Sequence, residues 1–158
     1  MVTIRQGKKD DLPKVLELIK ELAEYERAAH EVSNTLAMME TDGFGTNPIY
    51  GFFVAEEGAI IQGLSLYYYR YSTWKGKRLY LEDIIVTQSQ RGKGIGKDLF
   101  EVTMKKALDE NCTGMMWQVL EWNTPAIEFY KKYNSRLDPE WINCHLEAAQ
   151  IGEILKVN

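Results

Sequence analysis

The sequence is poor in cysteine and histidine, which limits the metal and disulfide chemistry that it can support. It contains two of each, Cys112, Cys144, His30 and His145, and none of them belongs to a cluster. Metal sites and disulfide frameworks need such residues at characteristic spacings. We therefore expect two reduced thiols, no metal site and no disulfide framework.

Long apolar runs and an excess of basic charge are also missing. No apolar stretch approaches the ~20 residues of a membrane-spanning helix, and residues 1–5 lack the apolar block of a signal peptide. The net charge is −4, so we expect no basic face for nucleic acid, whereas a cationic small substrate is compatible. With 158 residues, 45% of them hydrophobic, the chain is predicted to form one soluble, cytoplasmic domain over residues 1–158.

The hydrophobic pattern predicts a mixed α/β fold around one central sheet. Strands are predicted over residues 2–5, 52–56, 59–71, 78–86, 115–120 and 141–146. Helices are predicted over residues 12–23 and 33–43, from the end of a glycine-rich loop to about residue 108, and from residue 124 onward. The strand over residues 78–86 is rich in leucine, isoleucine and valine, which is typical of a strand buried on both faces. The tail from residue 147 has no clear pattern.

The glycine-rich loop, Arg91-Gly92-Lys93-Gly94-Ile95-Gly96, connects a predicted strand to a predicted helix. Backbone amides at a helix N-terminus are unpaired and carry the positive end of the helix dipole. Glycines let such a backbone approach an anion closely, and Arg91 and Lys93 add positive charge. The loop is therefore predicted to hold a phosphate or pyrophosphate, the alternative being a glycine-rich turn that binds nothing.

Two well-known phosphate loops do not match this segment. The P-loop pattern fails because Gly96-Lys97 is followed by Asp98, and no glycine precedes it at the required spacing. The Rossmann fingerprint fails because the third glycine is Gly96, one position too early.

Five segments together resemble the GNAT superfamily of N-acetyltransferases, and within it the spermidine/spermine N-acetyltransferase family. They are the loop over residues 91–96, YLED at 80–83, WNTPAIEFY at 122–130, DGFG at 42–45 and YSTWKG at 71–76. The segment at 71–76 is most similar to the thialysine N-epsilon-acetyltransferase branch. The resemblance covers nearly the whole chain, and the segments come in the family's order.

The resemblance implies a GNAT fold, in which helices flank a mixed central β-sheet whose central strands splay apart. It also implies acetyl-CoA as co-substrate and a homodimer in which the partner chain builds part of the acceptor pocket. By the resemblance the coenzyme would contact Ile84, Ile85, Val86, Arg91, Gly92, Lys93, Gly94, Ile95, Gly96, Lys97, Asn123 and Pro125.

Two residues are candidates for proton transfer at the thioester. An amine must lose a proton before it attacks, because an alkylammonium has a pKa of about 10.4. Glu82 interrupts an apolar strand, where a carboxylate is costly unless it is paired or used, and the resemblance makes it the general base, acting directly or through water. The alternative is an ion pair with Lys77 or Arg78. Strict strand alternation places Glu82 on one face with its neighbours two residues away, opposite Asp83.

Tyr130 is the candidate general acid for the leaving thiolate, and the alternative is a tyrosine of the core. The helix that carries Tyr130 ends at Asn134, where the family has glycine, and asparagine tolerates the left-handed conformation better than most residues.

The acceptor is expected to be a small primary amine. The resemblance places Tyr25 and Glu26 beside it, with Glu82 and Trp74 as further contacts, and carboxylates with aromatic faces suit a cation. Polyamine enzymes of the family carry an acid where this chain has Ser72, which favours a shorter, lysine-like or thialysine-like amine over a diamine or polyamine. The alternatives are a protein-lysine or antibiotic-amine acetyltransferase and a non-catalytic acyl-CoA sensor.

Overall fold

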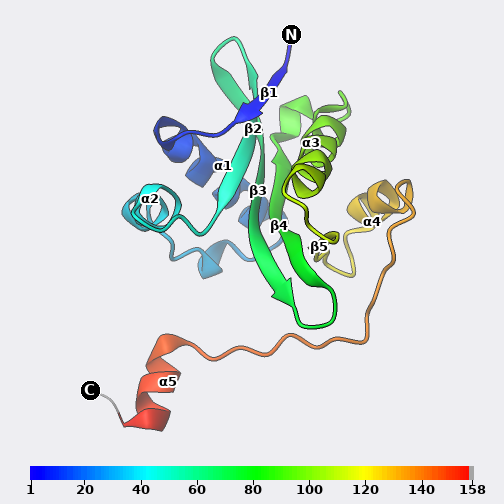
Figure 1. The fold of residues 1–158 in the computed structure, drawn as a ribbon. Helices are drawn as coiled ribbons and strands as arrows, with labels where there is room; N and C mark the ends of the chain where they lie inside the picture. Colours follow the sequence, from blue (N-terminus) through cyan, green and yellow to red (C-terminus); the bar gives the residue numbers. More distant parts are fainter. Residues whose placement is uncertain (157–158) are drawn as a thin grey trace. The chain divides into compact units, whose positions relative to one another are not determined.

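The structure, a computed structural model, describes residues 1–156 of the chain. The chain divides into two compact units, Met1–Leu120 and Glu121–Asn158. The first unit contains the whole sheet and helices α1, α2 and α3, and the second contains α4 and α5 (Figure 1). A single domain over residues 1–158 stays a prediction.

A mixed five-stranded sheet forms the centre of the first unit. The strands are β1 (Thr3–Gln6), β2 (Gly51–Glu57), β3 (Ile60–Ser72), β4 (Gly76–Val86) and β5 (Met115–Trp117), in the spatial order β1-β2-β3-β4-β5. Neighbouring strands are antiparallel except β4 and β5, which are parallel. The parallel pair needs a crossover connection, and α3 provides it.

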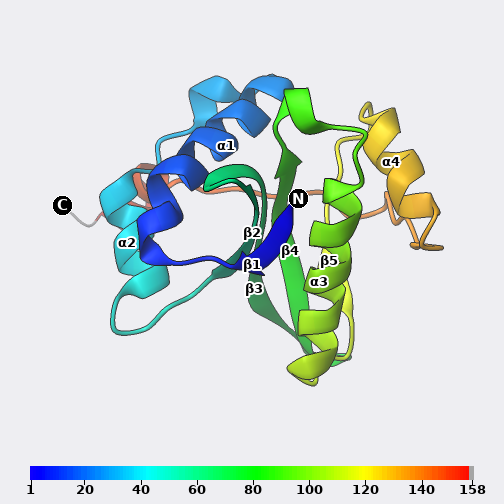
Figure 2. The ribbon, with the colours of Figure 1, turned by 90° about the horizontal axis from the view of Figure 1, so that it is seen from above.

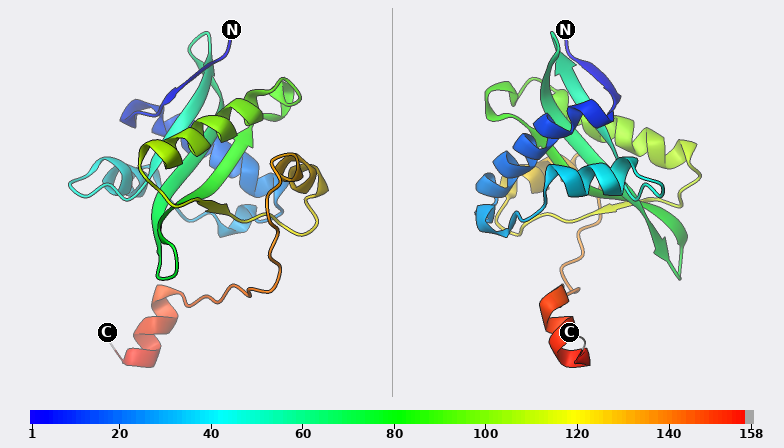
Figure 3. Two further views of the ribbon diagram at one scale, coloured as in Figure 1. Left: turned by 45° about the vertical axis from the view of Figure 1, so that its right-hand side comes forward. Right: turned by 90° about the vertical axis from the view of Figure 1, so that its left-hand side faces the viewer.

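Helices cover both faces of the sheet, as the predicted α/β class requires. Helices α1 (Leu12–Tyr25) and α2 (Leu36–Phe44) pack on one face and α3 (Ile95–Asp109) on the other, which the view from above shows most clearly (Figure 2). The two side views give the same arrangement (Figure 3). Three short 3-10 helices lie in the connections, at Lys9–Asp11, Ala29–Glu31 and Gln88–Gln90. Helix α2 begins later than predicted because Thr35, whose hydroxyl accepts from the Met38 amide, is its N-cap.

Each face of the sheet has its own hydrophobic core, because side chains alternate along a strand. On β2, for example, Phe52 and Val54 face α1 and α2, whereas Phe53 and Ala55 face α3. The first core comprises Leu12, Val15, Leu18, Met39, Phe52, Val54, Ile61, Leu64, Leu66 and Ile85. The second comprises Phe53, Ala55, Tyr67, Leu79, Ile95, Leu99 and Ala107.

The second unit contains α4 (Thr124–Lys131) and α5 (Ala148–Leu155). Asn134, after α4, has a φ of 54°, the left-handed conformation expected for it. The strand predicted over residues 141–146 is wrong, since this segment has no regular structure. Its apolar residues, such as Trp141 and Ile142, are typical of a strand, but a strand also needs a neighbour for its backbone hydrogen bonds, and no strand in residues 1–156 pairs with it.

Candidate active site

Strand β4 contains a β-bulge at Glu82. Leu66 of β3 pairs with Asp83, and the next residue, Tyr67, pairs with Leu81, so Glu82 is an extra residue in β4. The alternation of side chains along β4 is therefore shifted by one residue at this point: odd-numbered Leu79 faces α3 before the bulge, and even-numbered Ile84 and Val86 face α3 after it. Bulges are frequent beside active sites because they redirect side chains.

The bulge overturns the strict alternation expected around Glu82. Tyr80 pairs with Tyr68 on the α1 side of the sheet, whereas Ile84 packs with the core on the α3 side. Tyr80 and Ile84 therefore lie on opposite faces and cannot both share a face with Glu82. Asp83 is in register with Leu66, a residue of the α1-side core, so its side chain lies on the face that α1 covers.

Two carboxylates, Glu82 and Glu26, act on a third, Asp83. Glu26, directly after α1, is half-buried, and burial raises its pKa. Burial also raises the pKa of Glu82. Asp83 is affected most, since burial and the charges of Glu82 and Glu26 raise its pKa to about 7. A positive charge placed beside these carboxylates would therefore be stabilised.

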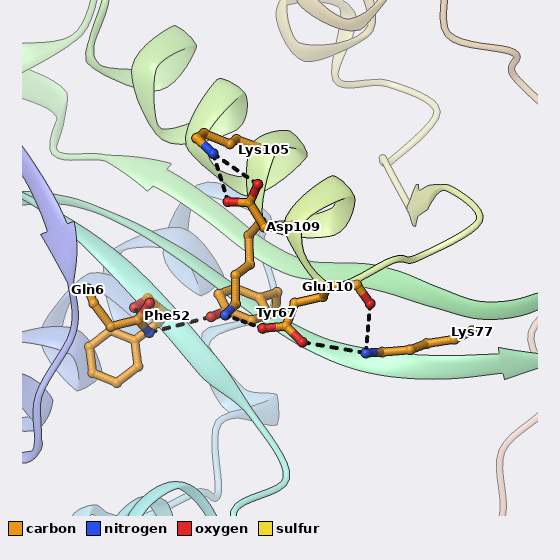
Figure 4. Close-up of polar contacts among 8 residues, drawn as sticks. Gln6, Phe52, Tyr67, Lys77, Lys105, Asp109 and Glu110 are labelled. Carbon is orange, nitrogen blue, oxygen red and sulfur yellow. Dashed lines mark hydrogen bonds and ion pairs between the residues drawn. The ribbon is translucent and has the colours of Figure 1, made fainter.

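The two basic residues that could have neutralised Glu82 have other partners. The ammonium of Lys77 donates to the Glu110 carbonyl at 3.0 Å and lies 3.6 Å from the Glu110 carboxylate (Figure 4). The guanidinium of Arg78 donates to the Met115 carbonyl at 3.1 Å. Within residues 1–156 neither Lys77 nor Arg78 forms an ion pair with Glu82. The structure therefore does not contain the ion pair considered as the alternative role of Glu82.

The glycine-rich loop opens α3 as the sequence predicts. Gly92 and Gly94 have φ angles of 77° and 86°, a conformation that favours glycine, and a Cβ at either would meet nothing within 4 Å. Gly94 is the N-cap of α3 and has no side chain with which to bind the first amides of the helix. The space above both glycines is open, so an anion could approach these amides directly. Gly96 has no positive φ, and a Cβ there would make only ordinary contact with Val86.

Three basic side chains surround this loop. Arg91 donates through Nε to the Val86 carbonyl at 3.0 Å, and its guanidinium lies over the Tyr25 ring at 5.0 Å. Lys93 donates to the Gln90 side chain at 2.6 Å, and Lys97 lies 3.9 Å from Glu101. All three make local contacts near the start of α3, where Arg91 and Lys93 add positive charge to that of the helix N-terminus.

The strand edge beside the loop is open. Strand β4 pairs with β5 only over Leu79–Leu81, opposite Met115–Trp117, and then continues to Val86. Beyond this point Ile84, Ile85 and Val86 pair with β3 on one side, and within residues 1–156 no strand pairs with them on the other. Pairing between the two central strands therefore ends one residue before the bulge.

Not every predicted acceptor residue comes to this region. Tyr25 and Glu26 do, because α1 ends beside β4 and the loop after it. Trp74 does not, since it lies at the turn between β3 and β4, at the opposite end of β4 from Val86, and is 84% exposed. Ser72 stabilises that same turn, where its hydroxyl accepts from the amides of Trp74 and Lys75.

Asn123, Pro125 and Tyr130 belong to the second unit. Asn123 caps α4, with its side-chain oxygen accepting from the Ala126 amide at 3.4 Å, and Pro125 lies in the first turn. The Tyr130 ring lies against Phe129 at 5.3 Å, and its carbonyl accepts from the Ser135 hydroxyl at 2.9 Å.

Asp83 is the site residue that sequence reasoning missed. Alternation assigned it to the face opposite Glu82, and nothing in the residue pattern of β4 marks a bulge. The one available signal was the occurrence of two adjacent carboxylates in an otherwise apolar strand, where each is costly unless it is used.

Comparisons with known proteins agree with this geometry. Residues 14–134 match the Acetyltransferase (GNAT) family. Thialysine N-epsilon-acetyltransferase of Bos taurus is 41% identical, over 82% of this chain and 81% of that protein. The enzyme of the same name from Mus musculus is 34% identical, over 96% of this chain and 95% of that protein. An integron cassette protein from V. cholerae shares the fold, with a TM-score of 0.78, 22% identity and 98% coverage of both chains.

These matches define the class of protein, an acetyltransferase that acts on amines. The chain belongs to the GNAT family of acetyltransferases. It is an N-acetyltransferase, and acetyl-CoA is the co-substrate of this family.

Proposed function

We propose that the protein transfers the acetyl group of acetyl-CoA to the primary amine of a small cationic molecule whose ammonium is bound by Glu26, Glu82 and Asp83. The observation that carries this proposal is the burial of Asp83 beside the charges of Glu82 and Glu26, which together raise the pKa of Asp83 to about 7. A cation among them relieves both the repulsion and the cost of burial. The site therefore favours an acceptor that arrives positively charged.

Acetyl-CoA is proposed to bind along β4 and the loop that follows. The amides at the start of α3, with Arg91, Lys93 and Lys97, have the charge and geometry to hold its pyrophosphate. The open edge of Ile84–Val86 offers backbone groups to the pantetheine arm, which resembles a peptide. Asn123 and Pro125 at the start of α4 are proposed to border the same arm.

The chemistry requires three proton transfers, because the nitrogen loses two protons and the sulfur gains one. Glu82 would take a proton from the ammonium, directly or through water, and the nitrogen would then attack the thioester carbonyl carbon. As the carbon–sulfur bond breaks, the thiolate would take a proton from the Tyr130 hydroxyl, the tyrosinate would regain one from the product nitrogen, and Glu82 would return its proton to solvent. Burial raises the pKa of Glu82 and so makes it a stronger base toward the ammonium.

The preferred acceptor is proposed to be lysine-like or thialysine-like, as the names of the similar enzymes suggest. A diamine or polyamine carries a second ammonium, and the family's acid for that charge is replaced here by Ser72. Because Ser72 and Trp74 lie at the hairpin turn, they could reach the acceptor only from a second copy of the chain. We therefore also propose that the protein is a homodimer. We propose the cytoplasm as its location.

A thiol-release assay with thialysine, lysine, a diamine and spermidine tests the proposal. We expect the highest kcat/KM with thialysine or lysine. The matched variant is Ser72→Asp, because aspartate can accept from the same turn amides and so preserve the hairpin. It should shift the preference toward spermidine. A wild-type preference for spermidine would contradict the proposed acceptor, and no thiol release with any amine would contradict the proposed reaction.

A further inference from the structure

The C-terminal half of α1 is attached to the connection between β4 and α3 at two points. Glu21 accepts hydrogen bonds from the Thr87 hydroxyl at 2.9 Å and from the Gln88 amide at 2.9 Å. Four residues later, on the same face of the helix, the Tyr25 ring lies under the Arg91 guanidinium at 5.0 Å. The two contacts bind one helix to the segment that leads into the coenzyme loop.

These contacts fix the orientation of Arg91. One face of its guanidinium lies on the Tyr25 ring, and Nε donates to the Val86 carbonyl at 3.0 Å. The two Nη groups have no protein acceptor among residues 1–156, and they form the edge that can bind an oxyanion in a bidentate way. An arginine held in this manner loses less side-chain freedom when it binds than a free one does.

We propose that Tyr25 and Glu21 are positioning residues for the coenzyme, and that they connect the pyrophosphate loop to the acceptor carboxylate Glu26. The inference rests on the proposed function. In this role the Tyr25 ring holds the Arg91 guanidinium, and the Tyr25 hydroxyl does not need to contact the amine. Because Glu26 directly follows Tyr25, a coenzyme that immobilises Arg91 also immobilises the end of α1 that carries Glu26.

Ring and hydroxyl can be separated by two substitutions. Tyr25→Leu removes the aromatic face, whereas Tyr25→Phe keeps the face and removes only the hydroxyl. A cation–π contact at an exposed site and the restored freedom of Arg91 together correspond to a roughly three- to tenfold weaker binding of acetyl-CoA in Tyr25→Leu. Tyr25→Phe should bind acetyl-CoA within about twofold of wild type. Tyr25 is 37% exposed, so both variants should fold.

Glu21→Ala provides a second, independent perturbation, and Glu17→Ala is its matched control. Glu17 lies one turn earlier on α1 and pairs with Lys14 at 2.8 Å, away from the loop. We expect Glu21→Ala to weaken acetyl-CoA binding and Glu17→Ala to leave it unchanged, with thermal melts confirming that both are folded.

The experiment measures acetyl-CoA affinity by calorimetry and turnover with acetyl-CoA or acetyl-pantetheine, which lacks the pyrophosphate. Tyr25→Leu should raise KM for acetyl-CoA, and its kcat/KM should fall less with acetyl-pantetheine than with acetyl-CoA. The inference is overturned if Tyr25→Leu and Glu21→Ala bind acetyl-CoA as wild type does. It is also overturned if Tyr25→Phe raises KM for the amine alone, which would make Tyr25 an acceptor contact. A wild-type chain that binds no acetyl-CoA would instead refute the proposed function.

Discussion

Replacing Asp83 with asparagine should stabilise the folded chain at neutral and alkaline pH and leave it nearly unchanged at pH 4. The Asp83 carboxyl is half-buried in the sheet, and the charges of Glu82 and Glu26 act on it. Its ionised form is therefore disfavoured in the folded state, whereas the unfolded chain ionises it freely. Asparagine has nearly the same shape and no charge to bury.

The pKa of Asp83 gives the size of the effect. Burial and its two acidic neighbours raise this pKa from the ordinary 3.8 to about 7. Each pKa unit corresponds to ~1.4 kcal/mol, so ionising Asp83 in the folded chain costs about 4 kcal/mol, and screening by water at a half-buried position lowers the expected gain to about 2 kcal/mol. Because the pKa of Asp83 is higher in the folded chain than in the unfolded chain, the wild-type protein is most stable with respect to this group below about pH 4. Its unfolding free energy then decreases as the pH rises toward the folded pKa of about 7, and stays constant above it.

Urea unfolding at pH 4, 6 and 8 measures the prediction. The difference in unfolding free energy between Asp83→Asn and wild type should grow from pH 4 to pH 8, whereas the control Asp10→Asn, at an exposed position, should show no such trend. Equal differences at pH 4 and pH 8 would refute the reasoning. The same variant should raise KM for the amine, because the cation loses one of its carboxylates.

Three further predictions concern the reaction. Glu82→Gln should lower turnover at neutral pH by about a hundredfold, with partial recovery as the pH rises and free amine increases, and an unaltered pH–rate profile would exclude a general base. Tyr130→Phe should lower turnover by a similar factor with acetyl-CoA affinity unchanged, and wild-type turnover would mean that the thiolate leaves unaided. Gly94→Asp should abolish measurable acetyl-CoA binding in a folded protein, whereas Gly96→Ala, where a Cβ makes only ordinary contact, should retain it.

Local patterns were sufficient to predict most of the secondary structure. Three segments have a sequence pattern that is typical of one kind of element. Helix α1 has an apolar face at helical spacing, β4 has a run of strand-forming apolar residues, and the loop before α3 has the glycines of a turn. An anion-binding role for the loop could also be proposed, because glycines and basic residues at a helix N-terminus suit an anion, and this role stays a prediction.

The parts that failed depend on pairing between distant segments. The bulge at Glu82 arises from how β4 aligns with β3, and no residue within β4 specifies it. The charge environment of Asp83 therefore could not be predicted either. The strand expected over residues 141–146 had a suitable composition, but composition does not reveal whether a neighbouring strand is available.

The bulge also determines which genetic changes the enzyme can tolerate along β4. Substitution of Glu82 changes one functional group and leaves the rest of the strand in place. Deletion of the same residue would remove the bulge, because Glu82 is the extra residue, and Leu81 and Asp83 could keep their partners Tyr67 and Leu66 as consecutive pairs. Ile84 and Val86 would still face α3, and Ile85 would still face α1, so that both hydrophobic cores would keep their complementary side chains. The bulge is therefore the position at which this strand can lose a residue, and a carboxylate with it, without exchanging its two faces.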